Sequence, residues 1–376
     1  MHHFEVAIIG GGPAGSTAAG TLAKKGINTC LIEKEKFPRN VLCGEFLSEQ
    51  VIKNIEDLGL KEAFFSCNPH KITNFNLYAS GGAHINAKIK FEAYALKRSV
   101  LDNLLLKNAA DNNCTLYQPA KVISIINYGN HYQVNFVRDG IEESVLANFI
   151  IASWGKQNIL DKSFDRVCAE AKTDYFAVKY FVNKKYLKNF NDNEIRIYTA
   201  GNIYCGINSV SDDEVTLCYL QKTSDGLAKS KWAEHLYLNN KKFRELFIGD
   251  LKEILGNLKP YGTGNLYFGK KEIYFKRIFF VGDAGGLIAP FAGDGISMAM
   301  ESGKLAGEFL SEICDKNYSI NSEIHYYKKS WYRRFNKRLK YAAFIQKVLL
   351  GSFGNLFILV GSKSKFMVRL IMNLTR

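Results

Sequence analysis

The sequence lacks the patterns that mark secreted, zinc-binding and disulfide-rich chains. Its 376 residues include eight cysteines, but none are spaced as C-x-x-C and none cluster, so the spacing favours reduced thiols. No charged segment followed by an apolar one comes before the first strand-like run, and we therefore expect no secretory leader. The cysteines are Cys30, Cys43, Cys67, Cys114, Cys168, Cys205, Cys218 and Cys314.

Acidic residues are absent from the end of the chain. Residues 326–376 contain twelve of the fifty Lys and Arg residues and no Asp or Glu, whereas the rest of the chain has 38 basic and 36 acidic residues. The net charge of +14 thus comes mainly from a tail and not from a stripe across the fold. This distribution argues against nucleic-acid binding.

The tail also lacks an uninterrupted apolar run long enough to cross a membrane. Its best window, residues 341–360, contains Gln346, Lys347, Asn355 and two glycines. The alternation of basic clusters with apolar stretches is typical of basic amphipathic helices. Three interpretations stay open: helices folded back on the main domain, an anchor on anionic lipid, or a dock for an acidic carrier protein. We expect a cytoplasmic protein, either free or peripheral on the inner face of the membrane.

The N-terminal segment contains a strand followed by a glycine-rich loop. Residues Phe4–Ile9 form an apolar run of buried-strand length, and the segment from Gly10 to Gly15 fits G-x-G-x-x-G. Small residues between 16 and 25 predict a helix that packs closely on a sheet, and Gly26 predicts its end. The sequence therefore predicts the first half of a dinucleotide-binding unit.

A second predicted strand, Thr29–Ile32, is followed directly by Glu33. The distance in sequence from the glycine motif to Glu33 is close to that expected for a ribose-binding acid. Glycines let the backbone approach a pyrophosphate, and the helix N-terminus supplies free N–H groups and partial positive charge. With strand, helix and acid all present, we interpret the segment as a dinucleotide site. The alternative is a structural turn with a solvated Glu33.

Another glycine-rich segment lies far downstream. Residues 278–281 predict a strand, which leads into Gly282-Asp283-Ala284-Gly285-Gly286, then Pro290 and Gly293-Asp294-Gly295. A helix is expected from Ile296 to Ser311. Between the two glycine motifs, Arg98 lies at the predicted start of an amphipathic helix that runs to about Asn112.

Together these segments resemble, over residues 4–315, the flavoprotein superfamily of geranylgeranyl reductases, p-hydroxybenzoate hydroxylase-type enzymes and flavin halogenases. The resemblance implies FAD, with Asp283 at the ribityl hydroxyls, Arg98 reaching the cofactor, and the amides of Gly295 and Ile296 stabilising negative charge on the reduced flavin. No metal is implied. The cofactor contacts carried over are Gly10, Gly12, Pro13, Ala14, Gly15, Glu33, Lys34, Cys43, Gly44, Arg98, Val122, Gly282, Asp283, Pro290, Gly293, Asp294, Gly295 and Ile296.

Residues 37–48 resemble the loop that passes the flavin ring in reductase-like members. Geranylgeranyl reductases have Cys-Gly-Gly there, and in this chain Glu45 replaces the second glycine after Cys43 and Gly44. Cys43 is the candidate catalytic residue, either as proton donor or as flavin neighbour, and the alternative is a small buried filler. Glu45 is open between an acid and a group that stabilises the loop.

Two departures from the superfamily narrow the reaction. The ring hydroxylases have an Asp-Gly pair after the strand that matches residues 149–152, where this chain has Ser153-Trp154-Gly155-Lys156. The Trp-x-Trp-x-Ile-Pro segment of the halogenases has no counterpart among the tryptophans Trp154, Trp232 and Trp331. Halogenation is therefore not expected, and the nicotinamide or pyrophosphate contact of the hydroxylases is not carried over.

The expected fold is α/β, with a Rossmann-type FAD-binding domain, an inserted antiparallel β-sheet substrate domain and a C-terminal helical extension. The FAD-binding domain comprises residues 1–70, 92–160 and 272–320, the substrate domain 71–91 and 161–271, and the basic amphipathic extension 321–376. Alternating strand patterns occur in residues 71–91 and 174–222. Tyr204, Gly206 and Asn208 on one strand are the candidate pocket residues, in a chain whose 13% aromatic content can line an apolar cavity.

The reaction stays open between two classes that both start with NADH or NADPH as the expected donor to the flavin. The sequence favours a reductase that acts on a carbon-carbon double bond of an apolar, lipid-like or carrier-bound substrate. The alternative is a monooxygenase that hydroxylates an aromatic or polyketide-like substrate through a flavin C4a-hydroperoxide. A flavin-binding scaffold without activity is the third class.

Overall fold

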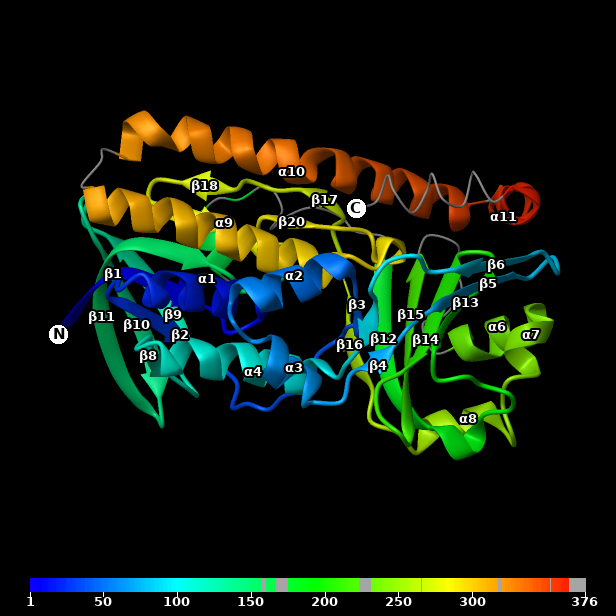
Figure 1. The fold of residues 1–376 in the computed structure, drawn as a ribbon. Helices are drawn as coiled ribbons and strands as arrows, with labels where there is room; N and C mark the ends of the chain where they lie inside the picture. Colours follow the sequence, from blue (N-terminus) through cyan, green and yellow to red (C-terminus); the bar gives the residue numbers. More distant parts are fainter. Residues whose placement is uncertain are drawn as a thin grey trace.

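The computed structural model describes residues 1–156, 160–164, 166, 175–222, 231–264, 266–316, 320–351 and 353–364. Of the residues discussed above, Cys168, Asp174 and the end of the predicted tail at 365–376 lie outside this part. The described chain forms two large β-sheets with helices packed on both, and one long helix runs along the molecule over the two regions (Figure 1). The predicted α/β architecture is confirmed.

The first sheet is the Rossmann-type core. In the described residues it has eight strands, with β1 in the centre between β11 and β2 and with parallel pairs out to β8 and β19. β18, β9 and β10 join it by antiparallel pairing. Its strands are β1 (His2–Ile9), β2 (Thr29–Ile32), β8 (Thr115–Tyr117), β9 (Lys121–Asn127), β10 (Tyr132–Arg138), β11 (Ile141–Ala152), β18 (Tyr274–Phe275) and β19 (Ile278–Phe280).

The second sheet is the inserted domain. Seven described strands have the order β16-β12-β15-β14-β13-β5-β6. Every pair is antiparallel except β5 with β13, because β5 enters from a separate segment of the chain and runs beside β13 in the same direction. The expected antiparallel sheet is therefore confirmed with one parallel pair. Its strands are β5 (Asn74–Ala79), β6 (His84–Lys88), β12 (Tyr175–Asn183), β13 (Glu194–Ala200), β14 (Ile203–Ser209), β15 (Glu214–Lys222) and β16 (Tyr261–Thr263).

Two small sheets and the helices complete the described fold. β3 (Phe46–Leu47) and β4 (His70–Lys71) pair with β7 (Tyr94–Ala95), and β17 (Gly269–Lys270) pairs with β20 (Gly286–Leu287). The helices are α1 (Pro13–Lys24), α2 (Glu49–Asp57), α3 (Lys61–Phe65), α4 (Arg98–Asp111), α5 (Leu160–Ser163), α6 (Trp232–Asn239), α7 (Lys241–Arg244), α8 (Leu251–Gly256), α9 (Gly295–Lys316), α10 (Ile320–Leu349) and α11 (Gly354–Lys363). Short 3-10 turns are η2 (Lys184–Tyr186), η5 (Gly282–Ala284) and η6 (Pro290–Ala292).

Each sheet buries apolar side chains on both faces. One face of the first sheet shares a core with α1, α9 and α10, and side chains of β10 pack on the other face. In the second sheet the outer face packs on α6, α7 and α8, so that face is closed by the domain's own helices. The inner face is turned toward the FAD-binding region, where Tyr204 of β14 contacts Phe291 of η6. Around Leu77 and Ile197 the inner face is covered by α10 and α11, so the part around Tyr204 is the one that faces the FAD-binding region.

The predicted C-terminal helices are confirmed, and the first of them belongs to the main core. Tyr327, Trp331 and Phe335 of α10 are buried against the first domain, and each contributes about 1.5–3 kcal/mol by burial of apolar surface. The basic residues Arg333, Arg334, Lys337 and Lys340 lie on the exposed side. The structure thus shows α10 folded back with a solvated basic face.

The N-terminus of α1 and the middle of α9 make an unusually close backbone contact. A β-carbon at Gly303 would lie 2.1 Å from the carbonyl oxygen of Ala14, and one at Gly282 would lie 2.9 Å from the β-carbon of Ala14. At Gly15 a β-carbon would lie 1.9 Å from the carbonyl oxygen of Gly10. These glycines let residues near the two ends of the chain meet, which brings the two glycine motifs to one place.

We expect Gly303→Ala to lower the free energy of unfolding by about 1–3 kcal/mol, because α1 and α9 must separate to admit the methyl group. Denaturant titration of the variant and the wild type measures this difference. Gly256→Ala is the matched control, since a β-carbon there meets no described atom within 4 Å. Equal losses in the two variants would contradict the role assigned to the helix contact.

Candidate functional site

The first glycine loop is arranged as an anion site at the start of α1. Gly10 has φ +105°, which favours glycine, and a β-carbon there would lie 2.6 Å from the carbonyl oxygen of Ser153. Gly12 is the N-cap of α1, makes no side-chain cap, and is followed by Pro13 in the first turn. The first amides of the helix therefore keep free hydrogens at its positive end.

Glu33 lies where the sequence predicts it, at the end of β2 and beside the glycine loop. Its carboxylate accepts hydrogen bonds from the amides of Gly11 at 2.6 Å and Glu35 at 2.8 Å. Both bonds orient the carboxylate at the loop and still leave lone pairs for a ribose hydroxyl. Lys34 is exposed. Val122 lies close to Glu33 in the fold, because the amide of Ala120, two residues before it, donates to the Glu33 carbonyl. The assigned cofactor contacts of these residues stay predictions.

Arg39 is a cofactor candidate that the sequence did not single out. Its guanidinium donates to Asp102 at 3.1 Å, lies 3.8 Å from the Glu33 carboxylate, and is the nearest group to a β-carbon built on Gly12. Arg98 binds the same Asp102 carboxylate through two N–H groups at 2.6 and 2.7 Å. Burial opposes the charge of Arg98, but Asp102 outweighs it and raises the pKa of the guanidinium. Arg39 thus places a cation beside the glycine loop, which suits a pyrophosphate, and Arg98 shares its Asp102 partner.

The second glycine motif supplies the opposite wall of the site. Gly282 has φ +58°, and its amide donates to Ser302 on α9 at 2.8 Å, which fixes η5 against the helix. The backbone carbonyl of Asp283 accepts from Lys271, but no described residue donates to the Asp283 carboxylate. This half-buried carboxylate is free to accept hydrogen bonds from a ligand, and its contact with the ribityl hydroxyls stays a prediction.

The loop before α9 ends at a helix N-terminus. Pro290 opens η6, and Gly293 closes it with φ +65°. The first helical hydrogen bond runs from Met298 N to Asp294 O, so the amides of Gly295 and Ile296 precede the bonded part of the helix. The Ile296 side chain itself is buried in the core, so a cofactor contact would use its backbone.

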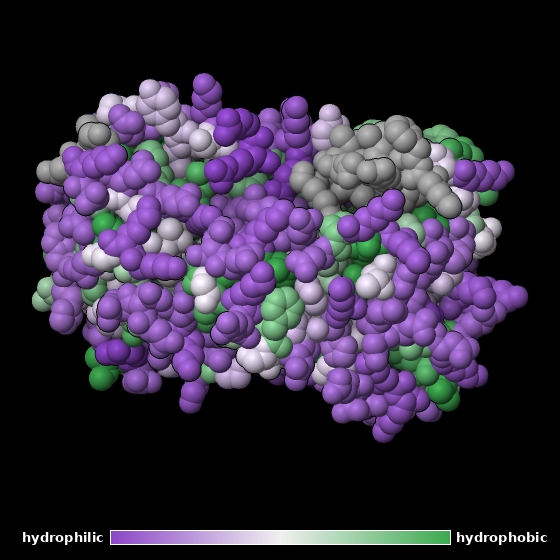
Figure 2. Space-filling view, in the orientation of Figure 1, coloured by the Kyte–Doolittle hydropathy of each residue, from purple (hydrophilic) through white to green (hydrophobic). Residues whose placement is uncertain are grey.

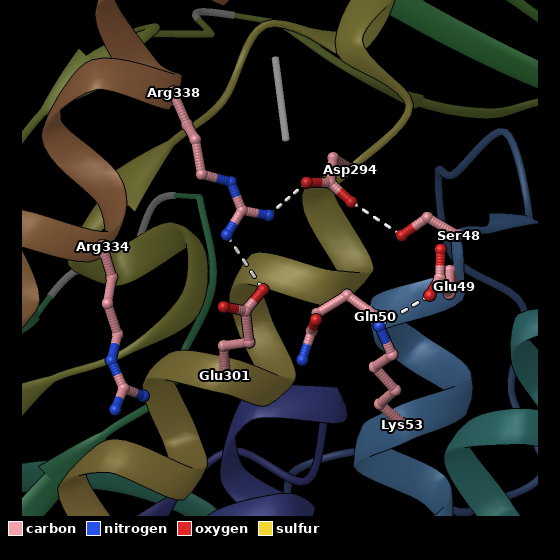
Figure 3. Close-up of a pocket in the computed structure, with 8 residues that line it drawn as sticks. All are labelled: Ser48, Glu49, Gln50, Lys53, Asp294, Glu301, Arg334 and Arg338. Atoms are coloured by element: carbon pink, nitrogen blue, oxygen red, sulfur yellow. Dashed lines mark hydrogen bonds and ion pairs between the residues drawn. The ribbon is translucent and has the colours of Figure 1, made fainter. Parts of the chain in front are cut away.

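The Asp294 carboxylate lies between the side chains of Ser48 and Arg338 (Figure 3). Ser48 donates to one oxygen at 2.8 Å, and Arg338 of α10 forms an ion pair with the other oxygen and with Glu301 at 2.9 Å. Burial raises the pKa of Asp294 even though Arg338 and Ser48 favour its charged form. The surface pocket at this point is lined by these charges and by Glu49, Gln50, Lys53 and Arg334. Its charges are of both signs and partly paired, so it is a poor site for an apolar substrate.

The segment with Cys43, Gly44 and Glu45 joins the two domains. Glu45 is completely buried at φ +59°, and its amide donates to the Cys43 sulfur at 3.3 Å. One carboxylate oxygen accepts from the amide of Arg98 at 3.0 Å, at the start of α4, and from the ammonium of Lys179 on β12 at 2.8 Å. The structure therefore brings Cys43, Glu45 and Arg98 together and adds Lys179 to them, whereas their assigned contacts with the flavin stay predictions.

The candidate pocket residues lie on the inner face of the second sheet. Tyr204 folds over Gly206, where a β-carbon would lie 3.2 Å from the tyrosine hydroxyl oxygen. Burial raises the pKa of Tyr204, so its hydroxyl stays protonated. The side-chain amide nitrogen of buried Asn208 and the hydroxyl of Thr216, its partner across the β14–β15 ladder, find no hydrogen-bond partner in the described residues. These polar groups on an apolar face could orient a ligand.

Three glycines test whether the site fits a cofactor. Gly12, Gly44 and Gly295 do not have positive φ, and a β-carbon on any of them meets no described protein atom closer than 3.7 Å. Neither backbone conformation nor packing within the described chain therefore requires glycine at these positions. Space beside them, free helix amides and the Asp283 carboxylate together fit a large dinucleotide cofactor.

Comparison with known proteins decides the family. Residues 3–223, more than half of the chain, match the FAD binding domain family. This chain belongs to that family. It is therefore an FAD-dependent oxidoreductase, and the predicted family is confirmed.

Relatives of this FAD-binding protein include reductases and halogenases. The digeranylgeranylglycerophospholipid reductase of Methanococcus vannielii is 26% identical over 92% of this chain and 87% of its own. A geranylgeranyl bacteriochlorophyll reductase-like structure from Thermoplasma acidophilum has TM-score 0.79 at 20% identity, with 100% of this chain and 93% of that chain covered. A flavin-dependent brominase has TM-score 0.80 at 19% identity, with 99% and 93% covered. The structural matches show a shared fold.

The sequence did not single out three charged residues near the site: Arg39, Lys179 and Arg338. They differ in whether the sequence contains a pattern that could have identified them. Lys179 interrupts an apolar strand, which is a usable signal, because a lysine on a buried face needs a partner. Arg39 lies in the loop already assigned to the flavin. Arg338 is one of many basic residues in the tail, and nothing in the sequence distinguishes it.

We expect Asp283→Asn to weaken FAD binding by about tenfold or more, because a charged acceptor contributes about 1.5–3 kcal/mol to a hydrogen bond. Titration of the apoprotein with FAD, followed by quenching of flavin fluorescence, measures the dissociation constant. Asp212→Asn, at a fully exposed side chain, is the control and should bind FAD as the wild type does. An unchanged constant for Asp283→Asn would remove this residue from the site.

Proposed function

We propose that this enzyme uses NADH or NADPH to reduce FAD and then reduces a carbon-carbon double bond of an apolar, lipid-like or carrier-bound substrate. FAD, when bound, accepts a hydride from one partner and passes it to the next. The observation that carries the proposal is the apolar inner face of the second sheet around Tyr204 and Leu220, which packs with Leu42 of the Cys43 loop and, through Tyr204, contacts Phe291 of η6. The part of this face around Leu77 is covered by α10 and α11. A long hydrocarbon fits such a face better than a polar metabolite does.

Two further observations support a reductase. Leu42, next to Cys43 in the loop that resembles the one in geranylgeranyl reductases, packs with Tyr204 and Leu220 of this apolar face. The digeranylgeranylglycerophospholipid reductase of Methanococcus vannielii covers nearly the whole chain, and its name describes reduction of a geranylgeranyl lipid. A geranylgeranyl lipid is therefore the first substrate to try.

The second part of the proposal concerns where such a substrate is found. Among the described residues no single helix is long and apolar enough to span a membrane. Only α10 and α11 taken together have the length and composition of a span, and the chain bends by 106° between them. Large apolar side chains are exposed around this bend, and Figure 2 shows hydrophobic residues at the end of the molecule where α11 lies. We define the docking face as Tyr341, Phe344, Phe353, Leu356, Leu359 and Val360.

Exposed basic residues lie on the same two helices as the docking face. Lys340, Lys347 and Lys363 are exposed, and the described parts of α10 beyond Glu323 contain no acidic residue. Apolar side chains beside lysines complement an anionic lipid surface, which accepts both. We therefore propose that the docking face lies on anionic lipid at the inner side of the membrane, next to lipid-like substrates.

The reaction is tested by anaerobic single-turnover reduction. We expect photoreduced holoenzyme to be reoxidised by a geranylgeranyl lipid in micelles without oxygen, with a product two hydrogens heavier, whereas the saturated lipid leaves it reduced. Stopped-flow absorbance of the flavin bands and mass spectrometry of the product measure both. Reoxidation that requires oxygen and gives a hydroxylated product would replace the reductase by a monooxygenase.

The docking face is tested by vesicle flotation. We expect the wild type to float with phosphatidylglycerol vesicles and not with phosphatidylcholine vesicles, and Phe344→Ser with Phe353→Ser to lower the bound fraction at least fivefold, since each loses about 1.5–3 kcal/mol of burial. Ile141→Ser, at an exposed side chain in another region, is the control. Equal binding by the double variant, or binding of an acidic carrier protein in place of vesicles, would overturn the lipid assignment.

A further inference from the structure

A lysine and a glutamate form a fully buried ion pair between the two domains. Lys179 lies on the inner face of β12, and Glu45 lies in the loop before β3, 134 residues away in sequence. Both side chains have no exposed surface, and the distance between Nζ and Oε1 is 2.8 Å. Such a pair is expensive to bury, by several kcal/mol for each ion, unless its remaining donors and acceptors are used.

The second carboxylate oxygen of Glu45 and the other protons of Lys179 have no hydrogen-bond partner among the described residues. Oε2 of Glu45 is buried and has no hydrogen-bond partner. The Lys179 ammonium carries three protons, and Glu45 is the one described acceptor that any of them reaches. Its other close neighbours are aromatic, with Nζ 4.1 Å from the ring centre of Phe181 and 5.4 Å from that of Tyr261. A buried polar group left in this state needs a further partner, either an ordered water or a ligand, or it has a catalytic role.

The pair lies where substrate and cofactor are expected to meet. Lys179 is opposite Cys218 in the β12–β15 ladder, and Cys218 is opposite Gly206, so Lys179 shares the inner face with the candidate pocket residues. Glu45 directly follows Gly44, beside which a β-carbon would meet no described atom within 4 Å. The free protons of Lys179 are thus held at the boundary between the flavin loop and the apolar sheet face.

We propose that Lys179 donates the proton in the reduction and that Glu45 is the positioning residue that holds its ammonium in place. The inference rests on the proposed reduction of a double bond. That reaction adds a hydride from the reduced cofactor to one alkene carbon, while the other carbon takes the electron pair of the double bond and needs a proton. The N–H bond of Lys179 breaks, a C–H bond forms, and the neutral amine regains a proton from solvent through the pair after product leaves.

The neighbouring thiols are poorer candidates for this proton. Burial raises the pKa of Cys218 to about 12, and the Cys43 sulfur already accepts from the Glu45 amide. Burial also raises the pKa of Glu45, although Lys179 and Arg98 favour its charged form. The groups that face Glu45 are Lys179 on β12, Arg98 on α4, Cys43 on its own loop and Cys218 on β15.

Two substitutions separate proton donation from a structural link. Lys179→Arg keeps the charge and the ion pair, but a guanidinium does not release its proton in proteins. Lys179→Met removes both. Lys97→Met is the matched control, because the ion pair of Lys97, the N-cap of α4, with Glu214 of β15 also links the first domain to the second sheet but is partly exposed. Glu45→Gln tests the positioning residue.

We expect Lys179→Arg and Lys179→Met holoenzymes to reduce FAD with NADH or NADPH at the wild-type rate and to reduce the geranylgeranyl lipid about 100-fold more slowly or worse. Lys97→Met should stay within about twofold of the wild type in both steps. Without turnover, a pH titration of the visible spectrum of oxidised FAD should show a transition in the wild type that both Lys179 variants lose and Glu45→Gln shifts.

The outcomes are distinguishable. If wild-type holoenzyme reduces no alkene, the proposed function fails and the proton donor with it. If the wild type reduces the lipid and folded Lys179→Arg does so equally fast, the pair is a structural link and this inference is wrong. A loss of rate that follows only the loss of folded protein, measured by denaturant titration, would also overturn it.

Discussion

The contact between α1 and α9 is the constraint on which the cofactor site depends. The two helices are far apart in the sequence, since α1 begins at Pro13 and α9 at Gly295. Each begins within one of the two glycine motifs. Glycine at Gly303 lets the backbone of α9 meet that of Ala14 in α1, and glycine at Gly282 lets η5 approach the Ala14 side chain, where a larger residue would collide. Because both helix ends must face one dinucleotide, their spacing decides whether pyrophosphate and isoalloxazine can be held at the same time.

Three buried or largely buried ion pairs then attach the rest of the molecule to this centre. Glu45 and Lys179 join the flavin loop to the second sheet, and Asp294, Glu301 and Arg338 join α9 to α10. Buried charges of this kind contribute little net stability compared with apolar residues, but they are costly to separate. Their effect is to favour one arrangement of sheet, loop and terminal helix over other compact arrangements.

The local parts of the fold could be predicted from the sequence. The predicted strand Thr29–Ile32 matches β2 at both ends. The helix predicted over residues 16–25 is observed as α1, which begins three residues earlier, at Pro13. These elements follow from periodicity and turn residues within about thirty positions. The position of Glu33 beside Gly11 follows from the same unit, since a parallel βαβ connection permits one arrangement.

Contacts between distant segments could not be predicted in the same way. The parallel pairing of β5 with β13 and the approach of Lys179 to Glu45 depend on how an inserted sheet packs on a discontinuous domain. No local pattern encodes that packing. Arg334 and Arg338 lie one helical turn apart on α10. Arg338 is buried and paired with Asp294 whereas Arg334 is exposed, and this difference depends on how α10 packs on the first domain.

The position of α10 in the main core has a consequence for biosynthesis. A ribosome releases β1, α1 and β2 first, but Trp331 and Arg338, which complete the core and secure the loop before α9, emerge some 300 residues later. A nascent chain therefore carries a glycine loop whose opposite wall has not yet been made. FAD loading is expected to follow synthesis of α10, so an interrupted translation product would be recognisable to quality-control proteases by its exposed β19 and α9 surfaces.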